Sequence, residues 1–145
     1  MKQWIRGPLA SQSAFVDFRN NIVEDWVLWG VRYEKSATGN VVNSVFGEST
    51  YAKNTFNNAN DGMSVTSDMP VYVSGIEFRG TATSKALVSA PSALPAAAVN
   101  TQSVAAMEPN VHANAGAMPR DAVDQQYIDT SSGWSVGKER PLRSV

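Results

Sequence analysis

The single histidine, His112, is the first residue to consider as a catalytic base. A hydrolytic triad needs a nucleophile, a base and an orienting group within hydrogen-bond reach of one another, all carried by rigid elements. His112 lies in "NVHANAG", where glycine and other small residues supply no rigid frame. The sequence therefore favours a polar residue on an extended segment over a catalytic histidine.

Two short patterns near the C-terminus partly match known catalytic motifs. The stretch "GWSVGK", residues 133–138, is one residue short of the phosphate-binding pattern G-x-x-x-x-G-K. Glu139 stands where that motif needs a magnesium-binding hydroxyl. Ser135 and Lys138 also match the S-x-x-K pattern of penicillin-recognising enzymes, but the partner motifs are missing. A surface tail is the simpler interpretation of this segment.

Acidic residues give no clearer signal of chemistry. A calcium loop starting at Asn57 would have Asp68 at its twelfth position, but Ala59 fills the third position, which should carry a ligand. An Asx-stabilised turn is the simpler reading. Paired acids such as Glu24 and Asp25 could in principle perform acid–base work, yet nothing in the sequence brings them to a pocket. We therefore expect surface carboxylates, no metal site and no cofactor.

The four tryptophans could carry a ligand by stacking or could serve only in packing. Trp26 and Trp29 lie in or beside the most apolar stretch, so we expect one of them in the core and leave the other open. Trp4 and Trp134 lie in the terminal segments, where they would act as anchors that bury against another surface.

The composition excludes several classes of protein. The chain has 145 residues, 12 Lys+Arg against 13 Asp+Glu, and a formal net charge of -1, so it has no field to attract nucleic acid or an anionic membrane. The absence of cysteine excludes disulfides and thiolate chemistry. The N-terminus lacks the apolar segment of a secretory signal, and no apolar run approaches the roughly 20 residues of a membrane-spanning helix.

The elements that must position any site begin with a predicted helix over residues 13–24. Its apolar residues follow the spacing of one helical face, after a capping serine at 11 or 13. The pattern then changes to strict alternation over residues 26–34, with Val27, Trp29, Val31 and Tyr33 on one side, which predicts a half-buried strand.

The region after this strand predicts further strands joined by tight turns. "TGN", residues 38–40, favours a hairpin turn into a strand at residues 41–48. Asp61-Gly62 is the next predicted tight turn, before a short edge strand at residues 63–66. Alternation resumes from residue 71, with Tyr72, Ile76 and Phe78 on a core face and Gly75 at a bulge. Residues 1–83 are thus predicted to form a mainly β, small antiparallel domain, a sandwich or barrel, with a short N-terminal helix.

Residues 84–119 form a predicted C-terminal arm of different character. Lys85 and Glu108 are its only charges, it has no aromatic residue, and four prolines interrupt it at positions 91, 95, 109 and 119. We predict an extended arm with one or two helical turns. Residues 120–145 would add a short helix or turn and a C-terminal tail.

Ordering such an arm requires a large contact surface. Fixing roughly 35 residues costs about 1–2 kcal/mol each in backbone entropy. At about 25 cal/mol per Å², compensation needs on the order of 1,500–2,500 Å² of apolar contact. A domain of about 80 residues has little such surface to spare. The arm is therefore predicted to lie in a groove between neighbouring subunits. The predicted partner-binding residues are Trp4, Leu87, Val88, Pro91, Leu94, Pro95, Val99, Val104, Met107 and Trp134.

A compact β domain followed by a long, low-charge Ala/Pro/Ser-rich arm resembles the accessory proteins of virus and bacteriophage particles, which clamp or decorate a shell of larger coat subunits. The resemblance implies a non-enzymatic minor capsid, cement or decoration protein. Its partners would be larger coat or shell subunits and copies of itself, with no nucleic acid, membrane, small-molecule substrate or cofactor. It would be assembled in the host cytoplasm and reside in the virion.

Two other functions remain open at this point. A receptor- or ligand-binding β module of a tail, spike or adhesin would be favoured by an exposed aromatic face at Trp29, Tyr33 or Tyr72. An enzyme or enzyme subunit would be favoured by a pocket that joins His112 to two carboxylates.

Overall fold

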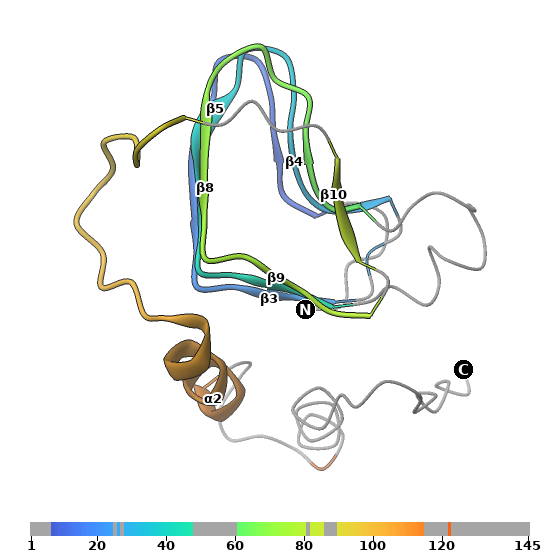
Figure 1. The fold of residues 1–145 in the computed structure, drawn as a ribbon, viewed down its shortest axis with the longest axis vertical. Coiled ribbons are helices and arrows are strands. Elements are labelled where there is room, and N and C mark those ends of the chain that lie inside the picture. Colours follow the sequence, from blue (N-terminus) through green and yellow to red (C-terminus); the bar gives the residue numbers. More distant parts are fainter. Residues whose placement is uncertain are drawn as a thin grey trace.

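The computed structural model describes residues 7–24, 26, 28–47, 61–80, 82–85, 90–114 and 122. Its first part winds into a three-sided coil of short strands, a parallel β-helix (Figure 1). The strands are β1 (Leu9–Ala10), β2 (Phe15–Arg19), β3 (Ile22–Val23), β4 (Trp29–Tyr33), β5 (Thr38–Val42), β6 (Val45–Phe46), β7 (Asp61–Val65), β8 (Val71–Ser74), β9 (Glu77–Phe78) and β10 (Thr83–Lys85). The chain completes three coils and begins a fourth with β10.

Each side of the coil is a parallel sheet built from one strand per coil. The orders are β1-β4-β7-β10, β2-β5-β8 and β3-β6-β9. Between the first and second coils, each residue pairs with the one 23 positions later, as in Phe15 with Thr38 and Ile22 with Val45. Between the second and third coils the offset is 32, as in Val45 with Glu77. The longer offset accommodates extra residues between β6 and β7.

The prediction of a mainly β fold is confirmed, but the antiparallel arrangement is wrong. Every strand pair in the described part of the chain is parallel. The predicted hairpin turn at residues 38–40 is the first half of β5, and the predicted tight turn at Asp61-Gly62 is the start of β7. The predicted edge strand at 63–66 overlaps β7, which ends at Val65 and is paired on both sides. Alternation of apolar residues is the same in parallel and antiparallel strands, so it could not distinguish them.

The predicted helix at residues 13–24 is also wrong, because this segment forms β2 and β3. Val16 and Phe18 point into the coil with the alternation of a strand. The chain then turns a corner at Asn20, which resets the phase so that Val23 points inward again. Because of this corner, the apolar residues lie about three and four positions apart, as they do on one face of a helix.

Stacked corners with left-handed backbone allow the coil to turn. Asn20 (φ 52°), Asn43 (φ 45°) and Gly75 (φ 64°) occupy the same corner in successive coils. Asparagine and glycine adopt positive φ at lower cost than other residues, which explains their use there. Gly75 therefore marks a corner between β8 and β9, and the bulge predicted at this position is not found.

The core is a ladder of side chains stacked along the coil axis. Phe46 in the middle coil stacks on Phe18 and Phe78, with ring centroids 6.1 and 5.7 Å apart. The rings of Trp26 and Phe46 make a T-shaped contact, with their centroids 6.4 Å apart. Trp26 is fully buried, as predicted for one of the tryptophans. Stacks of this kind bury a continuous core although each coil alone encloses little.

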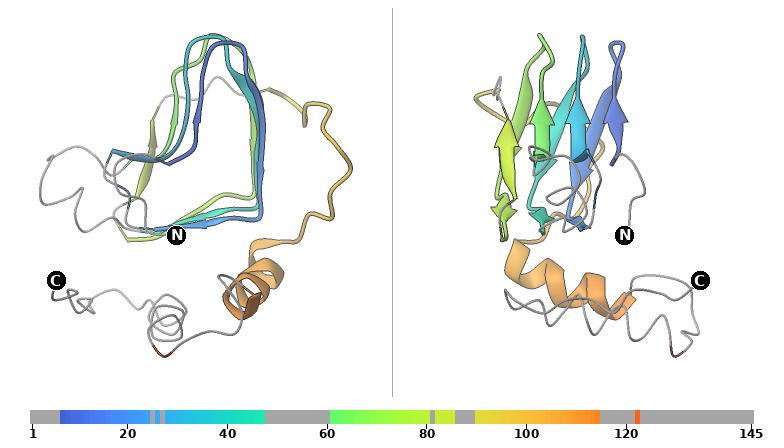
Figure 2. Two further views of the ribbon diagram at one scale, coloured as in Figure 1. Left: turned by 180° about the vertical axis from the view of Figure 1, so that it is seen from behind. Right: turned by 90° about the vertical axis from the view of Figure 1, so that its right-hand side faces the viewer.

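A segment without regular structure, residues 90–103, leaves the coil and leads to helix α2 (Val104–Asn114). Figures 1 and 2 show α2 beneath the sheet β3-β6-β9. The Ser103 hydroxyl accepts a hydrogen bond from the Ala106 N–H at 3.4 Å, so Ser103 caps the helix. The 11 residues of α2 exceed the one or two helical turns predicted for the arm. No helix in the described ranges has the length and apolar character to cross a membrane.

Candidate functional site

Asparagine side chains hold the segment 90–103 against its own coils at two points. Asn40 on β5 lies on the outer side of its strand and is fully buried. Its Nδ2 donates to the Leu94 carbonyl at 3.1 Å, and its Oδ1 accepts from the Leu94 N–H at 2.8 Å. The same Nδ2 donates to Asp17 Oδ1 at 2.9 Å. The carboxamide thus reproduces the two-bond pairing of a neighbouring strand.

The second attachment has the same chemistry at the other end of the segment. Asn20 Oδ1 accepts from the Gln102 N–H at 3.0 Å, and Asn20 Nδ2 donates to the Gln102 carbonyl at 2.7 Å. Asn43 Nδ2 donates to the same carbonyl at 2.7 Å. Arg19 Nη1 donates to Thr101 Oγ1 at 3.2 Å. We call Asn20, Asn40 and Asn43 the arm seat.

Between these two attachments the segment bows outward from the coil (Figure 1). Residues 95–100, "PAAAVN", are all exposed, and Val99 exposes 60% of its surface. Alanine and valine side chains are thereby presented to the surroundings, while the backbone on either side is hydrogen-bonded. The arm seat contacts main-chain groups of Leu94 and Gln102, and the side chains of residues 95–100 between them are exposed.

Helix α2 is held by an ion pair and one apolar face. Arg79 follows β9 and donates from Nη1 and Nη2 to the Glu108 carboxylate at 2.6 and 2.9 Å. These hydrogen bonds lower the pKa of Glu108, against the opposing effect of burial, and raise that of Arg79. Met107 is 1% exposed and Val104 and Val111 are half-buried, so one narrow face of the helix meets the coils.

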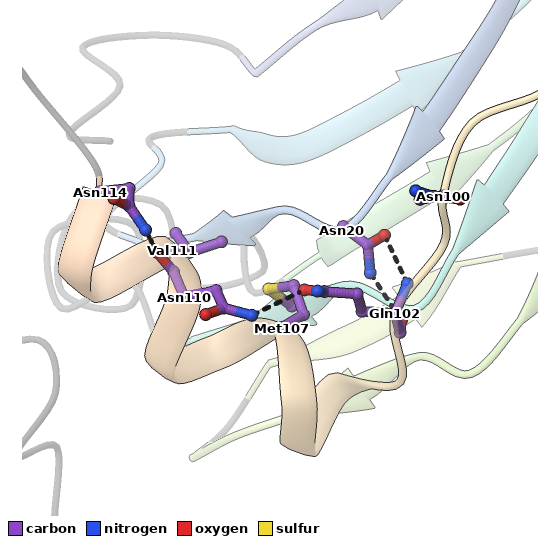
Figure 3. Close-up of a pocket in the computed structure, with 7 residues that line it drawn as sticks. All are labelled: Asn20, Asn100, Gln102, Met107, Asn110, Val111 and Asn114. Carbon is purple, nitrogen blue, oxygen red and sulfur yellow. Dashed lines mark hydrogen bonds between the residues drawn. The ribbon is translucent and has the colours of Figure 1, made fainter.

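A groove lies where α2 passes the Asn20 corner, and it has a volume of about 370 Å³ (Figure 3). The residues that line it are Asn20, Asn100, Gln102, Met107, Asn110, Val111 and Asn114. Five of these seven carry carboxamides and none is ionisable. Such a surface can donate and accept hydrogen bonds but offers no charge.

The predicted partner-binding residues have different surroundings. Pro91, Pro95 and Val99 are exposed, whereas Leu94 and Val104 are half-buried. Met107 is buried within the chain, so a partner can reach it only if α2 leaves its position. The other four predicted residues, Trp4, Leu87, Val88 and Trp134, lie outside the described residues.

The aromatic residues considered for ligand binding do not share one face. Tyr33 points into the core, where its hydroxyl donates to the Val16 carbonyl at 2.9 Å. Burial, and then the charge of Asp17, raise its pKa. Trp29 lies beneath the Arg32 guanidinium, 4.2 Å from the ring centroid, in the first sheet. Tyr72 is half-buried on the second sheet, in register with Asn40.

His112 lies on α2, with Nε2 3.7 Å from Glu108 Oε1. The same Glu108 carboxylate is engaged by Arg79, which leaves it no role as an unpaired acid. Among the described residues, no group of three His, Asp or Glu side chains is placed to hold a metal ion. In the described ion pairs, His112 pairs only with Glu108. Glu108 itself belongs to the contact between α2 and the coils.

The arm seat was missed by sequence reasoning, although a signal for it exists. Asn20 and Asn43 are 23 residues apart and each precedes a polar residue and two apolar ones, Ile22-Val23 and Val45-Phe46. A search for this spacing would have identified the coil repeat and its corners. Asn40 carries no such signal, because its partner Leu94 is distant in sequence.

Comparison of this chain with protein-family models, with curated proteins and with solved structures gave no match.

Proposed function

We propose that this chain is a non-enzymatic structural component of a large assembly, which clamps neighbouring subunits through its exposed arm. The setting we favour is a virus or bacteriophage particle, where the chain would be a minor capsid, cement or decoration protein. Its partners would be larger coat or shell subunits, and possible self-association would use the same arm.

One observation carries this proposal: residues 95–100 are exposed, although hydrogen bonds hold the main chain on both sides of them. A continuous run of apolar side chains from Pro95 to Val99 is costly to leave in water without a partner. Pro95 also restricts the free chain, which lowers the entropy lost when a groove captures the segment. The coil supports this role as a stiff base, since stacked coils form a quasi-one-dimensional solenoid.

The test is site-specific photo-crosslinking in the source cells. A photoreactive residue would replace Val99 in the full chain, and the same residue at exposed Asp68 would serve as the matched control on the coil. We expect a covalent product between position 99 and a larger subunit, with no such product from position 68. Products confined to this chain, or identical products from both positions, would contradict the clamp.

A second candidate function is a receptor- or ligand-binding β module of a tail, spike or adhesin. The groove beside α2 supports it, because five of the seven residues that line it carry uncharged carboxamides. In this candidate the arm joins the module to its neighbours, and the groove makes the functional contact.

A further inference from the structure

The first coil has a strand edge without a neighbour among the described strands. β2 lies at the end of its sheet and pairs only with β5 (Figure 2). We infer that this edge receives the exposed arm segment, residues 95–99, of a second copy of the chain, which adds to it as a further strand. The inference rests on the clamp under the proposed function and names a second copy as one of its partners.

The register of β2 with β5 determines which main-chain groups of β2 stay unpaired. The Thr38 N–H donates to the Ala14 carbonyl at 2.9 Å, and the Asn20 N–H donates to the Val42 carbonyl at 3.1 Å. Alternate residues of a parallel strand bond to the same neighbour, so the residues between them turn their main-chain groups away from β5. These residues are Phe15, Asp17 and Arg19.

The charged residues of β2 do not close this edge. Charged side chains often protect an unpaired edge from pairing with another chain. On β2, Arg19 Nε donates to Asp17 Oδ2 at 2.6 Å, and Asp17 Oδ1 accepts from Asn40 Nδ2 at 2.9 Å. The Arg19 carbonyl accepts from Asn21 Nδ2 at 2.7 Å, whereas the N–H groups of Phe15 and Asp17 have no acceptor in the described structure. Both charges are thus satisfied within the chain, and the edge keeps donors for an added strand.

The arm segment supplies a complementary row of main-chain groups. In the described structure, the N–H groups of residues 96–99 donate no hydrogen bond, and among their carbonyls only that of Val99 accepts one, from Thr101 Oγ1 at 3.3 Å. Small alanine side chains let another backbone approach closely, and proline is tolerated at the first residue of an edge strand, where Pro95 would lie. The segment therefore fits strand addition, in which main-chain bonds join an extended segment to a sheet edge.

The arm seat prepares the segment for this contact. It holds the main chain at Leu94 and Gln102, on either side of the segment, which lowers the entropy lost when the segment pairs. It also holds the arm over the outer face of the sheet β2-β5-β8, whereas an added strand must lie in the plane of the sheet beside β2. The segment therefore pairs with the edge of another molecule and not with its own.

Exposed apolar side chains lie on both segments that would meet. Of the four large apolar side chains that are exposed in the described residues, Leu9 and Phe15 lie on the first coil and Val99 lies in the arm segment. Contact between the two segments would remove such surface from water, which favours association. The main-chain bonds would set the alignment of the added strand, and the apolar side chains would add to its affinity.

The test is analytical ultracentrifugation of the full chain at up to about 0.5 mM, which detects weak self-association. The paired variant Ala97→Pro with Ala98→Pro removes one N–H from each side of the arm segment, and Ala97→Ser with Ala98→Ser is the matched control that keeps both. Phe15→Pro removes an N–H of the β2 edge, and Phe15→Ala keeps it. We expect the wild type to self-associate, and each proline variant to do so at least about tenfold more weakly than its control.

Mixing the two proline variants distinguishes this contact from association of two arms or of two edges. The arm variant keeps an intact edge and the Phe15 variant keeps an intact arm segment, so the mixture should form a heterodimer although each variant alone stays mainly monomeric. Circular dichroism and protection of the Leu94 and Gln102 amides from hydrogen exchange check folding. If Phe15→Pro does not fold, the proline pair against the serine pair decides alone.

Three results would overturn the inference. They are a wild type that stays monomeric at about 0.5 mM, equal association of the proline and serine pairs, and a mixture of folded proline variants that forms no heterodimer. In each case a larger subunit crosslinked at Val99 would still support the clamp, so the two proposals fail separately.

Discussion

The coil and the arm region hold their backbones in different ways. In the coil, residues 7–85 as described, strand pairs and a stacked core act together, and side chains such as Val41 and Phe46 are fully buried. In the arm region, residues 90–114, a few carboxamides, one ion pair and the apolar face of α2 around Met107 act at separate points. Separate contacts can therefore hold the arm region without the continuous stacked core of the coil. The difference also implies that the arm can open locally while the coil stays folded.

The largest expected effect comes from breaking the core of the coil. Phe46→Ala removes the ring that contacts both Phe18 and Phe78, so we expect a loss of about 3–5 kcal/mol in the free energy of unfolding. Urea denaturation followed by circular dichroism measures it. Val99→Ala is the control in the arm and should change stability by less than about 0.5 kcal/mol. Equal effects at the two sites would remove the distinction between the regions.

A smaller effect is expected from the arm seat itself. Asn40→Ala removes both hydrogen bonds to Leu94 and the bond to Asp17, at a fully buried position. We expect a loss of about 1–3 kcal/mol and faster hydrogen exchange at the Leu94 amide. Asn100→Ala is the matched control, because Asn100 makes no such bonds in the described residues. Unchanged protection at Leu94 in the Asn40 variant would show that the seat does not hold the arm.

The corner variant Gly75→Ala tests whether the two regions are coupled. An added Cβ would clash with Asn43 Oδ1, and the φ of 64° disfavours alanine. We expect a loss of about 1–2 kcal/mol, accompanied by weaker protection of the amides near Gln102, because Asn43 must move. Hydrogen exchange detects both effects. Ser74→Ala should change neither, and loss of stability without any change near Gln102 would show that the corner and the arm are independent.

The smallest effect concerns the pH dependence of α2 docking. The pKa of Glu108 is lowered in the folded state by Arg79, so the ion pair contributes fully above the ordinary carboxyl pKa of about 4.3. The contribution is lost as the pH falls through the lowered folded pKa, and it is at most about 1 kcal/mol. The Met107 methyl shift measured from pH 7 to pH 3 should report this loss. Glu108→Gln should already show the weakened state at pH 7, and an identical pH response in both proteins would refute the role of the pair.

Parts of the fold could be predicted and parts could not. The strand at residues 26–34 was found because Val31 and Tyr33 alternate with Arg32 in a half-buried sheet, and β4 confirms it. The helix at residues 13–24 was predicted wrongly because a corner at Asn20 shifts the alternation by one residue. Trp29 was assigned to the same side as Val31, but it lies on the outer side with Arg32. Local periodicity therefore identified the strand at residues 26–34 but failed across the corner at Asn20.

The candidate site was less predictable than the fold. A change of character after the last strand was visible in composition, and the exposed run from Pro95 to Val99 agrees with it. The attachments were not visible, because Asn40 binds main-chain atoms of Leu94 and any residue at position 94 would supply the same groups. Helix α2 was underestimated, since its stability comes from contacts of Met107 and Glu108 with the coils and not from local propensity.

Local sequence patterns were sufficient to predict that strands dominate, that one of Trp26 and Trp29 belongs to a core and that the chain changes character near residue 84. These properties depend on the residue types and their spacing along a short stretch. Tertiary structure alone decided that the strands run parallel, that Asn20 and Asn43 stack at one corner, and that a groove forms beside α2. The physical reason is that strand direction and side-chain convergence depend on residues 23 or 32 positions apart meeting in space, which no local pattern specifies.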